Sequence, residues 1–172
     1  MIELKPFTEA DFYLLISWIK TEEALMQFAG VNFSFPLTAD QLAANIENKK
    51  ITAYKAVHQP ANKTIGHGEI YITDEGEAIL GKIMIGEEAL RGNGFGGEIV
   101  KQLVHIAFTQ LNVKKVLLYV FDWNVSAIKC YQNAGFEIER GNDKKRYING
   151  QTWTAIRMGM NEDDWLKLTN TV

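Results

Sequence analysis

The chain has 172 residues, of which 47% are hydrophobic and 23% charged, and its formal net charge is −3. These values are ordinary for one soluble globular domain, which we expect to span residues 1–172, and they argue against a nucleic-acid binder that neutralises phosphates. The single cysteine, Cys130, excludes an internal disulfide, and without a signal-peptide core or a membrane-spanning apolar run we expect a cytoplasmic protein that binds no membrane.

The N-terminal segment is predicted to form a short strand and two helices. Residues 2–7 alternate as a strand does, and Thr8 with Asp11 three residues later has the spacing of a capping box at a helix start. A second helical piece is expected over residues 22–28, and it should stop at Gly30 because glycine favours helix ends.

A third helix is predicted after an aromatic-rich loop at residues 30–36. Thr38 and Gln41 have the spacing of another capping box. The cations Lys49 and Lys50 suit the C-terminus of a helix, where the helix dipole is negative, so we expect this helix to end beside them.

Three strands follow, joined by short turns. Residues 51–58 and 64–73 are strand candidates on either side of a turn at residues 59–63, and residues 74–77 form a second turn. Residues 78–85 are mostly apolar, as expected for a central buried strand. The sequence therefore predicts an antiparallel meander.

A glycine-rich segment, Arg91–Gly97, comes next and leads into an amphipathic helical pattern over residues 94–111. Glycine has no Cβ, so a bulky anion can approach its backbone amides closely. The first turn of a helix also leaves N–H groups unpaired at the positive end of the helix dipole. The segment therefore predicts an anion site, most often one for phosphate, with Arg91 as a cation at its entrance.

The sequence pattern Gly92-x-Gly94-x-x-Gly97 also fits the dinucleotide-binding fingerprint of a Rossmann-type domain. That fingerprint places glycine directly at a strand end in a βαβ unit. Here residues 86–91 separate the strand from the loop, and a meander precedes it, so this interpretation is disfavoured. A P-loop is excluded because no Gly-Lys-Ser/Thr follows, and a purely structural turn would cost backbone entropy for no packing gain.

The second half begins with a strongly apolar strand over residues 115–121. The strand–helix–strand crossover that leads to it predicts that it lies parallel to residues 78–85. Another helix should begin with Asn124 or Asp122 as its N-cap and end at Gly135.

The C-terminal part is predicted to form a hairpin and a short tail helix. Residues 136–140 form a strand that residues 144–148 extend after an irregular loop. The dipeptide at 149–150, Asn-Gly, is a strong signal for a two-residue hairpin turn, and residues 151–160 are the partner strand. The fold class is therefore α/β with a mixed sheet that is not doubly wound.

The helix predicted after the strand at 115–121 carries Asn124, Ala127 and Tyr131 on one face. The small Ala127 leaves room between a polar amide and a phenol, so this face suits a slender ligand. Periodicity alone favours a simpler role for Tyr131, as an aromatic residue at the core edge with its hydroxyl in water.

Together these motifs resemble those of the GNAT superfamily of acetyl-CoA-dependent N-acetyltransferases. The family motif Arg/Gln-x-x-Gly-x-Gly/Ala matches Arg91-x-x-Gly94-x-Gly96, and its later motif Asn-x-x-Ala-x-x-x-Tyr-x-x-x-Gly-Phe matches residues 124–136. The resemblance is specific over residues 77–140, and the order of the other elements extends it over nearly the whole chain. It implies a single-domain GNAT-like α/β (α+β) fold, in which a parallel central strand pair splays around the CoA site and helices cover both faces of the sheet.

The resemblance also implies how acetyl-CoA binds. Amides of residues 92–97 would hold the pyrophosphate, and strand residues 83–85 would pair with the pantetheine while one amide polarises the acetyl carbonyl. Asn124 would contact the pantetheine arm, and Tyr131 would act as general acid toward the leaving thiolate. The implied cofactor-binding residues are Ile83, Met84, Ile85, Arg91, Gly92, Asn93, Gly94, Phe95, Gly96, Gly97, Asn124, Ala127 and Tyr131.

The amine must be neutral when it attacks, so a base or a water path is expected. The strand at residues 78–85 carries no carboxylate. Our candidate base is Glu69, which lies mid-strand with His67 and Tyr71 on its face, and the alternative is a solvated strand face. No spacing of His, Cys or Asp supports a metal site.

The acceptor is expected between the first two helices and the hairpin at residues 144–153. It would be a small-molecule amine or a peptide or protein amino group, and the sequence does not select between them. The residues available to line this site are Trp18, Phe28, Phe33 and Trp153, for which core packing is the alternative role. The strand-rich C-terminal end also permits a homodimer, which is common in the family.

The favoured activity is acetyl transfer from acetyl-CoA to a primary amine by direct attack in a ternary complex. The alternative is a non-catalytic acetyl-CoA-binding or sensing module of the same fold, against which the intact Asn124–Tyr131 pair argues. A Rossmann-type nucleotide-binding domain is the third hypothesis.

Overall fold

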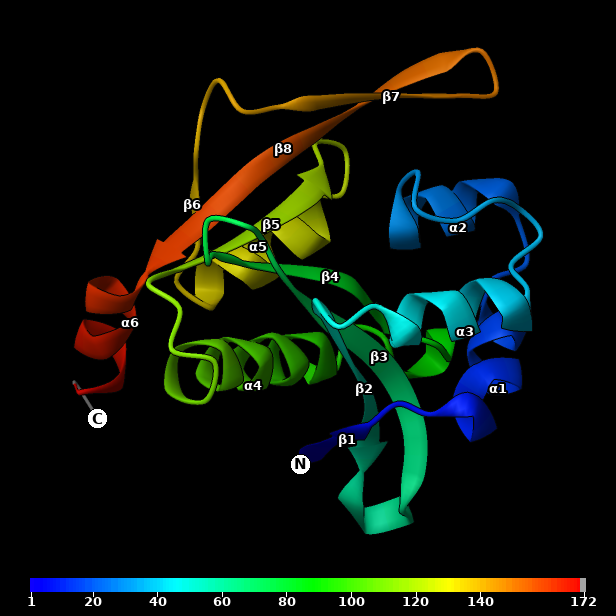
Figure 1. Cartoon of the computed structure of the whole chain (residues 1–172), viewed down its shortest axis with the longest axis horizontal. Helices are drawn as coiled ribbons and strands as arrows, with labels where there is room; N and C mark the ends of the chain where they lie inside the picture. The colour runs from blue at the N-terminus through cyan, green and yellow to red at the C-terminus, as the bar shows by residue number, and fades with distance from the viewer. Residues whose placement is uncertain (171–172) are drawn as a thin grey trace.

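One mixed sheet of eight strands organises the computed structural model, which describes residues 1–170 (Figure 1). The strands lie in the order β1-β2-β3-β4-β5-β8-β6, and β7 also pairs with β8. β4 and β5 pair in parallel and the other pairs are antiparallel, which confirms the predicted sheet. The strands are β1 (Ile2–Pro6), β2 (Ile51–His58), β3 (Lys63–Ile72), β4 (Ala78–Ile85), β5 (Lys115–Phe121), β6 (Glu137–Ile138), β7 (Lys144–Ile148) and β8 (Gln151–Asn161).

Helices cover both faces of the sheet (Figure 1). On one face, α4 buries Ile99, Leu103 and Ala107 in a core shared with β3, β4 and β5. On the other face, α1, α2 and α3 enclose a second apolar cluster that includes Leu15 and Leu42. Within residues 1–170, none of the helices combines the length and apolar character that a membrane crossing needs. The helices are α1 (Phe12–Trp18), α2 (Glu22–Ala29), α3 (Ala39–Glu47), α4 (Phe95–Thr109), α5 (Val125–Asn133) and α6 (Glu162–Thr169), with short 3₁₀ turns η1 (Glu9–Asp11), η2 (Gln59–Ala61) and η3 (Glu88–Leu90).

Two helix starts follow their sequence signals, and α3 also ends close to its predicted end. Asp11 accepts the N–H of Thr8 at 2.9 Å, which confirms the first capping box. Thr38 accepts the N–H of Gln41 at 3.3 Å and so caps α3. α3 ends at Glu47 with Asn48 as its C-cap, directly before Lys49 and so close to its predicted end, while Lys50 pairs with Asp74.

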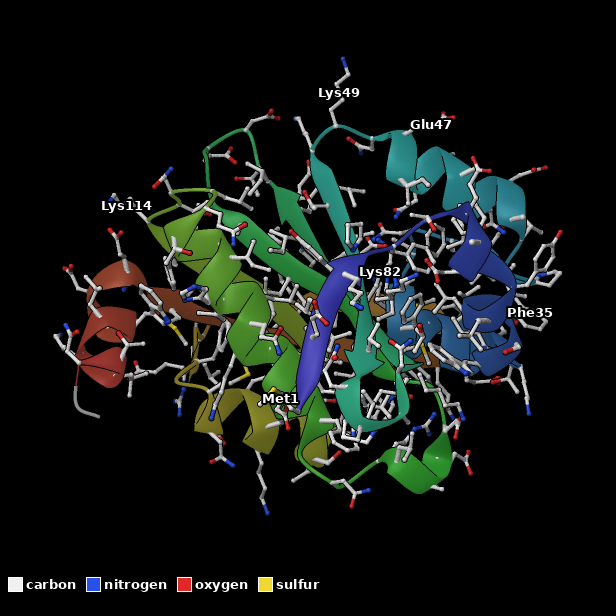
Figure 2. All side chains as sticks on the ribbon, turned by 90° about the horizontal axis from the view of Figure 1, so that it is seen from below. Met1, Phe35, Glu47, Lys49, Lys82 and Lys114 are labelled. Atoms are coloured by element: carbon white, nitrogen blue, oxygen red, sulfur yellow. The ribbon has the colours of Figure 1, made fainter. Side chains whose placement is uncertain are left out.

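The parallel pair β4 and β5 separates after three residues. Pairing joins Ala78–Leu80 to Val116–Leu118 and goes no further. Beyond this point β4 carries an extra residue relative to β3, at Lys82, whose φ is +49°. A bulge of this kind bends a strand and increases its twist, so β4 turns away from β5 and a V-shaped gap opens between them. Figure 2 shows Lys82 within the molecule, unlike the outward-pointing Lys49.

The C-terminal hairpin projects toward α2 (Figure 1). Asn149 and Gly150 have φ values of +47° and +75°, as a type I′ turn requires, and they join β7 to β8. The side chain of Asn149 donates a hydrogen bond to Glu23 of α2. β6 and β7 both pair with β8, so residues 144–148 do continue the strand that begins at residue 137, after an interruption.

Candidate active site

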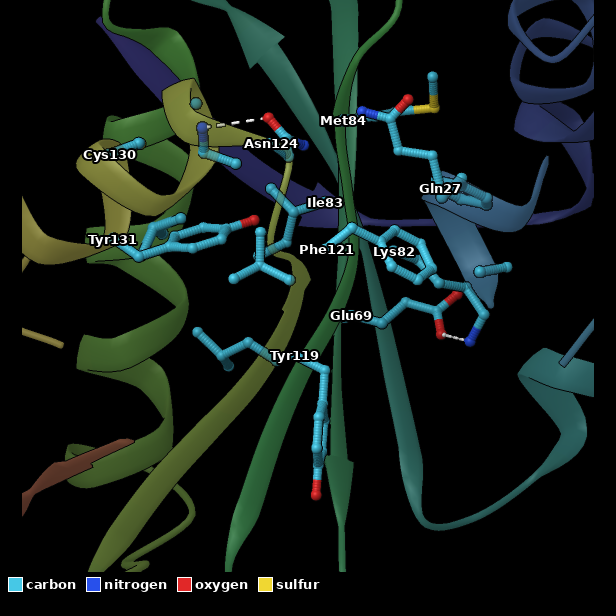
Figure 3. Close-up of a pocket in the computed structure, with 18 of the residues that line it drawn as sticks. Gln27, Glu69, Lys82, Ile83, Met84, Tyr119, Phe121, Asn124, Cys130 and Tyr131 are labelled. Atoms are coloured by element: carbon cyan, nitrogen blue, oxygen red, sulfur yellow. Dashed lines mark hydrogen bonds and ion pairs between the residues drawn. The ribbon is translucent and has the colours of Figure 1, made fainter. Parts of the chain in front are cut away.

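A cleft of about 1470 Å³ occupies the gap between β4 and β5 (Figure 3). Sites for one small molecule commonly measure about 300–1,000 Å³, so this cleft has room for two reactants. β4 divides it into two sides, as Figure 3 shows. We call the side that holds Asn124 and Tyr131 the α5 side, and the side that holds Gln27, Glu69 and Lys82 the α2 side.

The glycine loop, residues 91–97, forms one end of the α5 side. Among residues 1–170, the six N–H groups from Gly92 to Gly97 donate no hydrogen bond to another protein group. Gly92 and Gly94 have φ values of +78° and +82°, a conformation that residues with a Cβ rarely adopt. A Cβ at either position would meet no atom within 4 Å, so the space beside these two residues is open. The loop and the 15-residue helix α4 behind it form the predicted anion cradle.

Three loop side chains support this cradle, namely Arg91, which lines the cleft, and Asn93 and Phe95, which do not. The Arg91 guanidinium donates to the carbonyls of Ile85 and Gly86, at 3.1 and 3.3 Å, and so ties the loop to the end of β4. Asn93 turns its amide toward the carbonyl of Arg91. The Phe95 ring packs against a histidine of β2 at 5.2 Å between ring centroids.

The edge of β4 presents backbone groups to the gap. The N–H of Gly86 donates to Ile65 of β3 at 2.9 Å. Because hydrogen-bonding directions alternate along an antiparallel pair, Met84 also faces β3, while the polar backbone groups of Ile83 and Ile85 face the gap. β5 no longer pairs with β4 here, so these groups are available to a ligand. The Trp18 indole packs against Gly86, where an added Cβ would lie 2.0 Å from it.

α5 supplies the opposite wall of the α5 side. The side-chain oxygen of Asn124 accepts the N–H of Ala127 at 3.3 Å, so Asn124 is the N-cap of α5. Tyr131 lines the cleft, and its hydroxyl points toward Ile83 (Figure 3). Burial, with a smaller contribution from neighbouring Cys130, raises the pKa of the Tyr131 phenol, so it is protonated at neutral pH. Burial also raises the pKa of the Cys130 thiol, which disfavours a thiolate there.

A buried polar cluster forms the wall of the α2 side. Glu69 is 3% exposed, so the alternative of a solvated strand face is wrong. Its carboxylate accepts hydrogen bonds from Lys82 Nζ at 2.7 Å, His67 Nε2 at 3.1 Å and Asn45 Nδ2 at 2.9 Å. Burial would raise the pKa of Glu69, but the hydrogen bond from His67 and the charge of Lys82 outweigh it and hold this pKa below its usual value.

The four aromatic candidates for the acceptor site occupy different places. Trp18 and Phe28 line the cleft. Phe33 lies behind the lining, with its ring centroid 5.2 Å from the ammonium of Lys82. Trp153 packs against the rings of Phe121 and Trp123, at 5.0 and 5.1 Å, so it supports the cleft wall.

Sequence reasoning did not single out three cations of the α2 side, Lys82, Lys144 and Arg146. Lys82 sits in a predicted apolar strand, where a lysine ordinarily indicates an exposed edge. Lys144 and Arg146 alternate along β7, which predicts a shared face but does not say which face meets the cleft.

Comparisons with known proteins all match this chain to acetyltransferases. A family model described as an acetyltransferase (GNAT) domain matches residues 2–137. The aminoglycoside N(6')-acetyltransferase type 1 of Klebsiella pneumoniae is 26% identical over 152 residues, which cover 79% of this chain and 74% of that protein. The spermidine N(1)-acetyltransferase of Escherichia coli K12 is 34% identical over 76 residues, which cover 44% of this chain and 41% of that protein.

Solved structures share the fold. The spermidine N-acetyltransferase of Vibrio cholerae, in complex with CoA and spermine, superposes with a TM-score of 0.80 at 21% identity, covering 96% of this chain and 98% of that one. An aminoglycoside acetyltransferase in complex with coenzyme A and kanamycin gives a TM-score of 0.76 at 20% identity, covering 98% and 99%.

Proposed function

The chain belongs to the GNAT acetyltransferase family, and on that premise we propose that it transfers the acetyl group of acetyl-CoA to a primary amine by direct attack in a ternary complex. The observation that carries this proposal is the open gap between β4 and β5, with unpaired amides of the glycine loop at one end and the Tyr131 hydroxyl inside it. Bound acetyl-CoA would supply an activated acetyl thioester there.

The α5 side fits the shape and charge of CoA. The unpaired N–H groups of residues 92–97 would hold the pyrophosphate at the positive end of the α4 dipole. The backbone groups of Ile83 and Ile85 would pair with the amides of the pantetheine, as a neighbouring strand would. Asn124 uses its side-chain oxygen to cap α5, which leaves its amide N–H₂ to donate to the pantetheine arm.

Two groups would stabilise charge as the amine attacks. The N–H of Ile83 faces the gap and would donate to the acetyl carbonyl oxygen as negative charge develops there. The Tyr131 phenol would donate its proton to the departing sulfur. Its raised pKa keeps that proton in place until the thiolate forms. Holding both reactants in one cleft supplies the attack geometry.

Glu69 is our candidate for receiving the proton that the amine loses. Among the described residues that line the α2 side, it is the sole carboxylate. Its lowered pKa keeps it ionised but makes it a weak base, so the proton would reach it through water as the new amide bond forms. Lys82 and Asn45 would hold the carboxylate in place.

The relatives are named for aminoglycosides and spermidine, which supports a small-molecule amine as acceptor rather than a peptide or protein amino group. Trp18 and Phe28 would line the acceptor site, and Phe33 and Trp153 would support it. We further propose that residues 1–172 act as one N-acetyltransferase domain in the cytoplasm. A homodimer through the β7–β8 hairpin is part of the same proposal.

Release of free thiol from acetyl-CoA in the presence of a panel of amines tests this function. We expect thiol release that depends on both the amine and the protein. Binding of acetyl-CoA without thiol release across the panel would indicate a non-catalytic sensing module instead. Calorimetry with NAD as a control ligand should show no binding.

A further inference from the structure

We propose that the amine acceptor carries an anionic group, a carboxylate or a phosphate, and that Arg146 and Lys144 of β7 bind it on the α2 side of the cleft. This inference rests on the proposed function and narrows its substrate class. The amine end would then lie toward the gap beside β4, while the anionic end lies under the hairpin.

Strand register places both cations on the cleft face. Lys144 pairs with Ala155 and Arg146 with Trp153, while Ala155 also pairs with Phe121 of β5. Residues directly opposite one another in a sheet point to the same face. Lys144 and Arg146 therefore share the face of Phe121, and both line the cleft.

The residue between them points the other way. Lys145 lies opposite Thr154, and its ammonium donates to the Thr154 hydroxyl at 2.8 Å. Lys145 does not line the cleft. The strand thus offers two cations to the cleft and turns a third, of equal charge, away from it.

Neither cleft-facing cation is neutralised by a carboxylate within residues 1–170. The Lys144 ammonium lies over the Tyr119 ring, 3.8 Å from its centroid. The Arg146 guanidinium donates to the backbone carbonyl of Lys145 at 3.0 Å. Lys82 is paired with Glu69, so the α2 side retains two unpaired positive charges. The acidic side chain of Glu23, from α2, does not line the cleft and accepts a hydrogen bond from Asn149.

This charge pattern discriminates among amines. A polyamine or other polycation would place further positive charge beside Lys144 and Arg146, and like charges at a binding site cost free energy. A carboxylate or phosphate would gain charge-assisted hydrogen bonds, and the planar guanidinium of half-buried Arg146 matches both groups. The acceptor therefore needs one attacking amine and one acidic group.

The phosphates of CoA do not account for these cations. The glycine loop and the N-terminus of α4 form the phosphate cradle, which lies on the face of the sheet that α4 covers. Lys144 and Arg146 share the face of Phe121, on the α2 side. An acceptor is the remaining reactant that this side can bind.

The test compares four primary amines of similar size, namely γ-aminobutyrate, phosphoethanolamine, butylamine and putrescine. Thiol release and mass spectrometry of the product would give kcat and KM for each. We expect kcat/KM for at least one of the two anionic amines to exceed that for butylamine and putrescine by roughly tenfold. Comparison of γ-aminobutyrate with phosphoethanolamine shows whether the site prefers a carboxylate or a phosphate.

Variants assign the effect to these side chains. Arg146→Ala and Lys144→Ala should each raise KM for the preferred anionic amine roughly tenfold more than they change KM for butylamine. Arg146→Glu should shift preference toward putrescine. Lys145→Ala is the matched control, because it removes an equal charge from the opposite face of β7 and should change nothing.

The outcomes separate the two proposals. If putrescine is the best acceptor and Arg146→Ala leaves its kinetics unchanged, the anionic acceptor is wrong and acetyl transfer stands. The same holds if butylamine is acetylated and neither anionic amine is. If no amine in the panel is acetylated although acetyl-CoA binds, both proposals fail.

Discussion

The ammonium of Lys82 lies 2.7 Å from a carboxylate oxygen of Glu69, and both side chains are buried in the wall of the α2 side. The pair exists because the bulge in β4 turns Lys82 toward β3, with φ at +49°. Burial makes the two charges interdependent, since removing one leaves the other without compensation.

Glu69→Gln should therefore lower the free energy of unfolding by about 3 kcal/mol, because it leaves the buried Lys82 ammonium without a compensating negative charge. Urea denaturation measures this change. The double variant Glu69→Gln/Lys82→Met should recover most of the loss, since it removes both charges. Equal stability of the native chain and Glu69→Gln would show that the ion pair contributes nothing to stability.

If Glu69 also receives the proton of the amine, the Glu69→Gln/Lys82→Met variant should have kcat reduced by about a hundredfold.

The same pair predicts how stability depends on pH. The folded-state pKa of Glu69 lies below its ordinary value of 4.5, because the hydrogen bond from His67 and the charge of Lys82 outweigh burial. A depressed carboxyl pKa contributes stability that is present above the unfolded value and is lost as pH falls through the folded value. Urea titrations below about pH 5 should show this loss. The Glu69→Gln/Lys82→Met variant should lose less stability over the same range, and an identical acid profile would contradict the assignment.

Tyr131→Phe should lower kcat by at least about tenfold while acetyl-CoA binds almost as before. The variant keeps the ring that packs against Phe136 and removes only the hydroxyl aimed at Ile83. Steady-state kinetics with calorimetry of acetyl-CoA separates the two effects. Since the pKa of Tyr131 is raised above its ordinary value of 10.0, its deprotonation should not limit kcat below that pH. Unchanged turnover would remove Tyr131 from the mechanism.

Gly94→Ala should weaken CoA binding, because a Cβ at φ +82° strains the loop and projects into the space where the phosphates would lie. The backbone strain should cost about 1–2 kcal/mol of stability. Gly141→Ala is the matched control, since Gly141 has φ +83°, equally open surroundings and no place in the cleft lining. Both variants should lose similar stability, but calorimetry should detect weaker CoA binding in Gly94→Ala alone. Equal CoA affinity in the two variants would contradict the phosphate cradle.

The elements with local sequence signals could be predicted closely. The strand at residues 115–121 matched its predicted bounds, because apolar β-branched and aromatic residues are bounded there by turn residues. The Asn149-Gly150 turn was equally clear, since few other residues adopt its backbone angles. Asn124, Ala127 and Tyr131 were predicted to share a face and do line one wall of the cleft.

Features that depend on tertiary contacts could not be predicted. The left-handed backbone at Lys82 has no local signal, since lysine has no preference for it, and it is the bulge against β3 that imposes it. Likewise Asn45 reaches Glu69 from α3, 24 residues away along the chain, because α3 packs beside β2. That Arg146 lines the cleft follows from the register of β7 with β8, which the sequence of β7 alone does not give.

In the proposed reaction, acetyl passes directly from acetyl-CoA to an amine within one cleft. Initial rates with both substrates varied, combined with mass spectrometry of the amine and the protein, distinguish direct transfer from an acetylated enzyme. For direct transfer we expect intersecting double-reciprocal lines, one acetylated amine for each thiol released and no acetylated protein intermediate. Parallel lines with an acetyl group trapped on Cys130, or thiol release without acetylated amine, would contradict it.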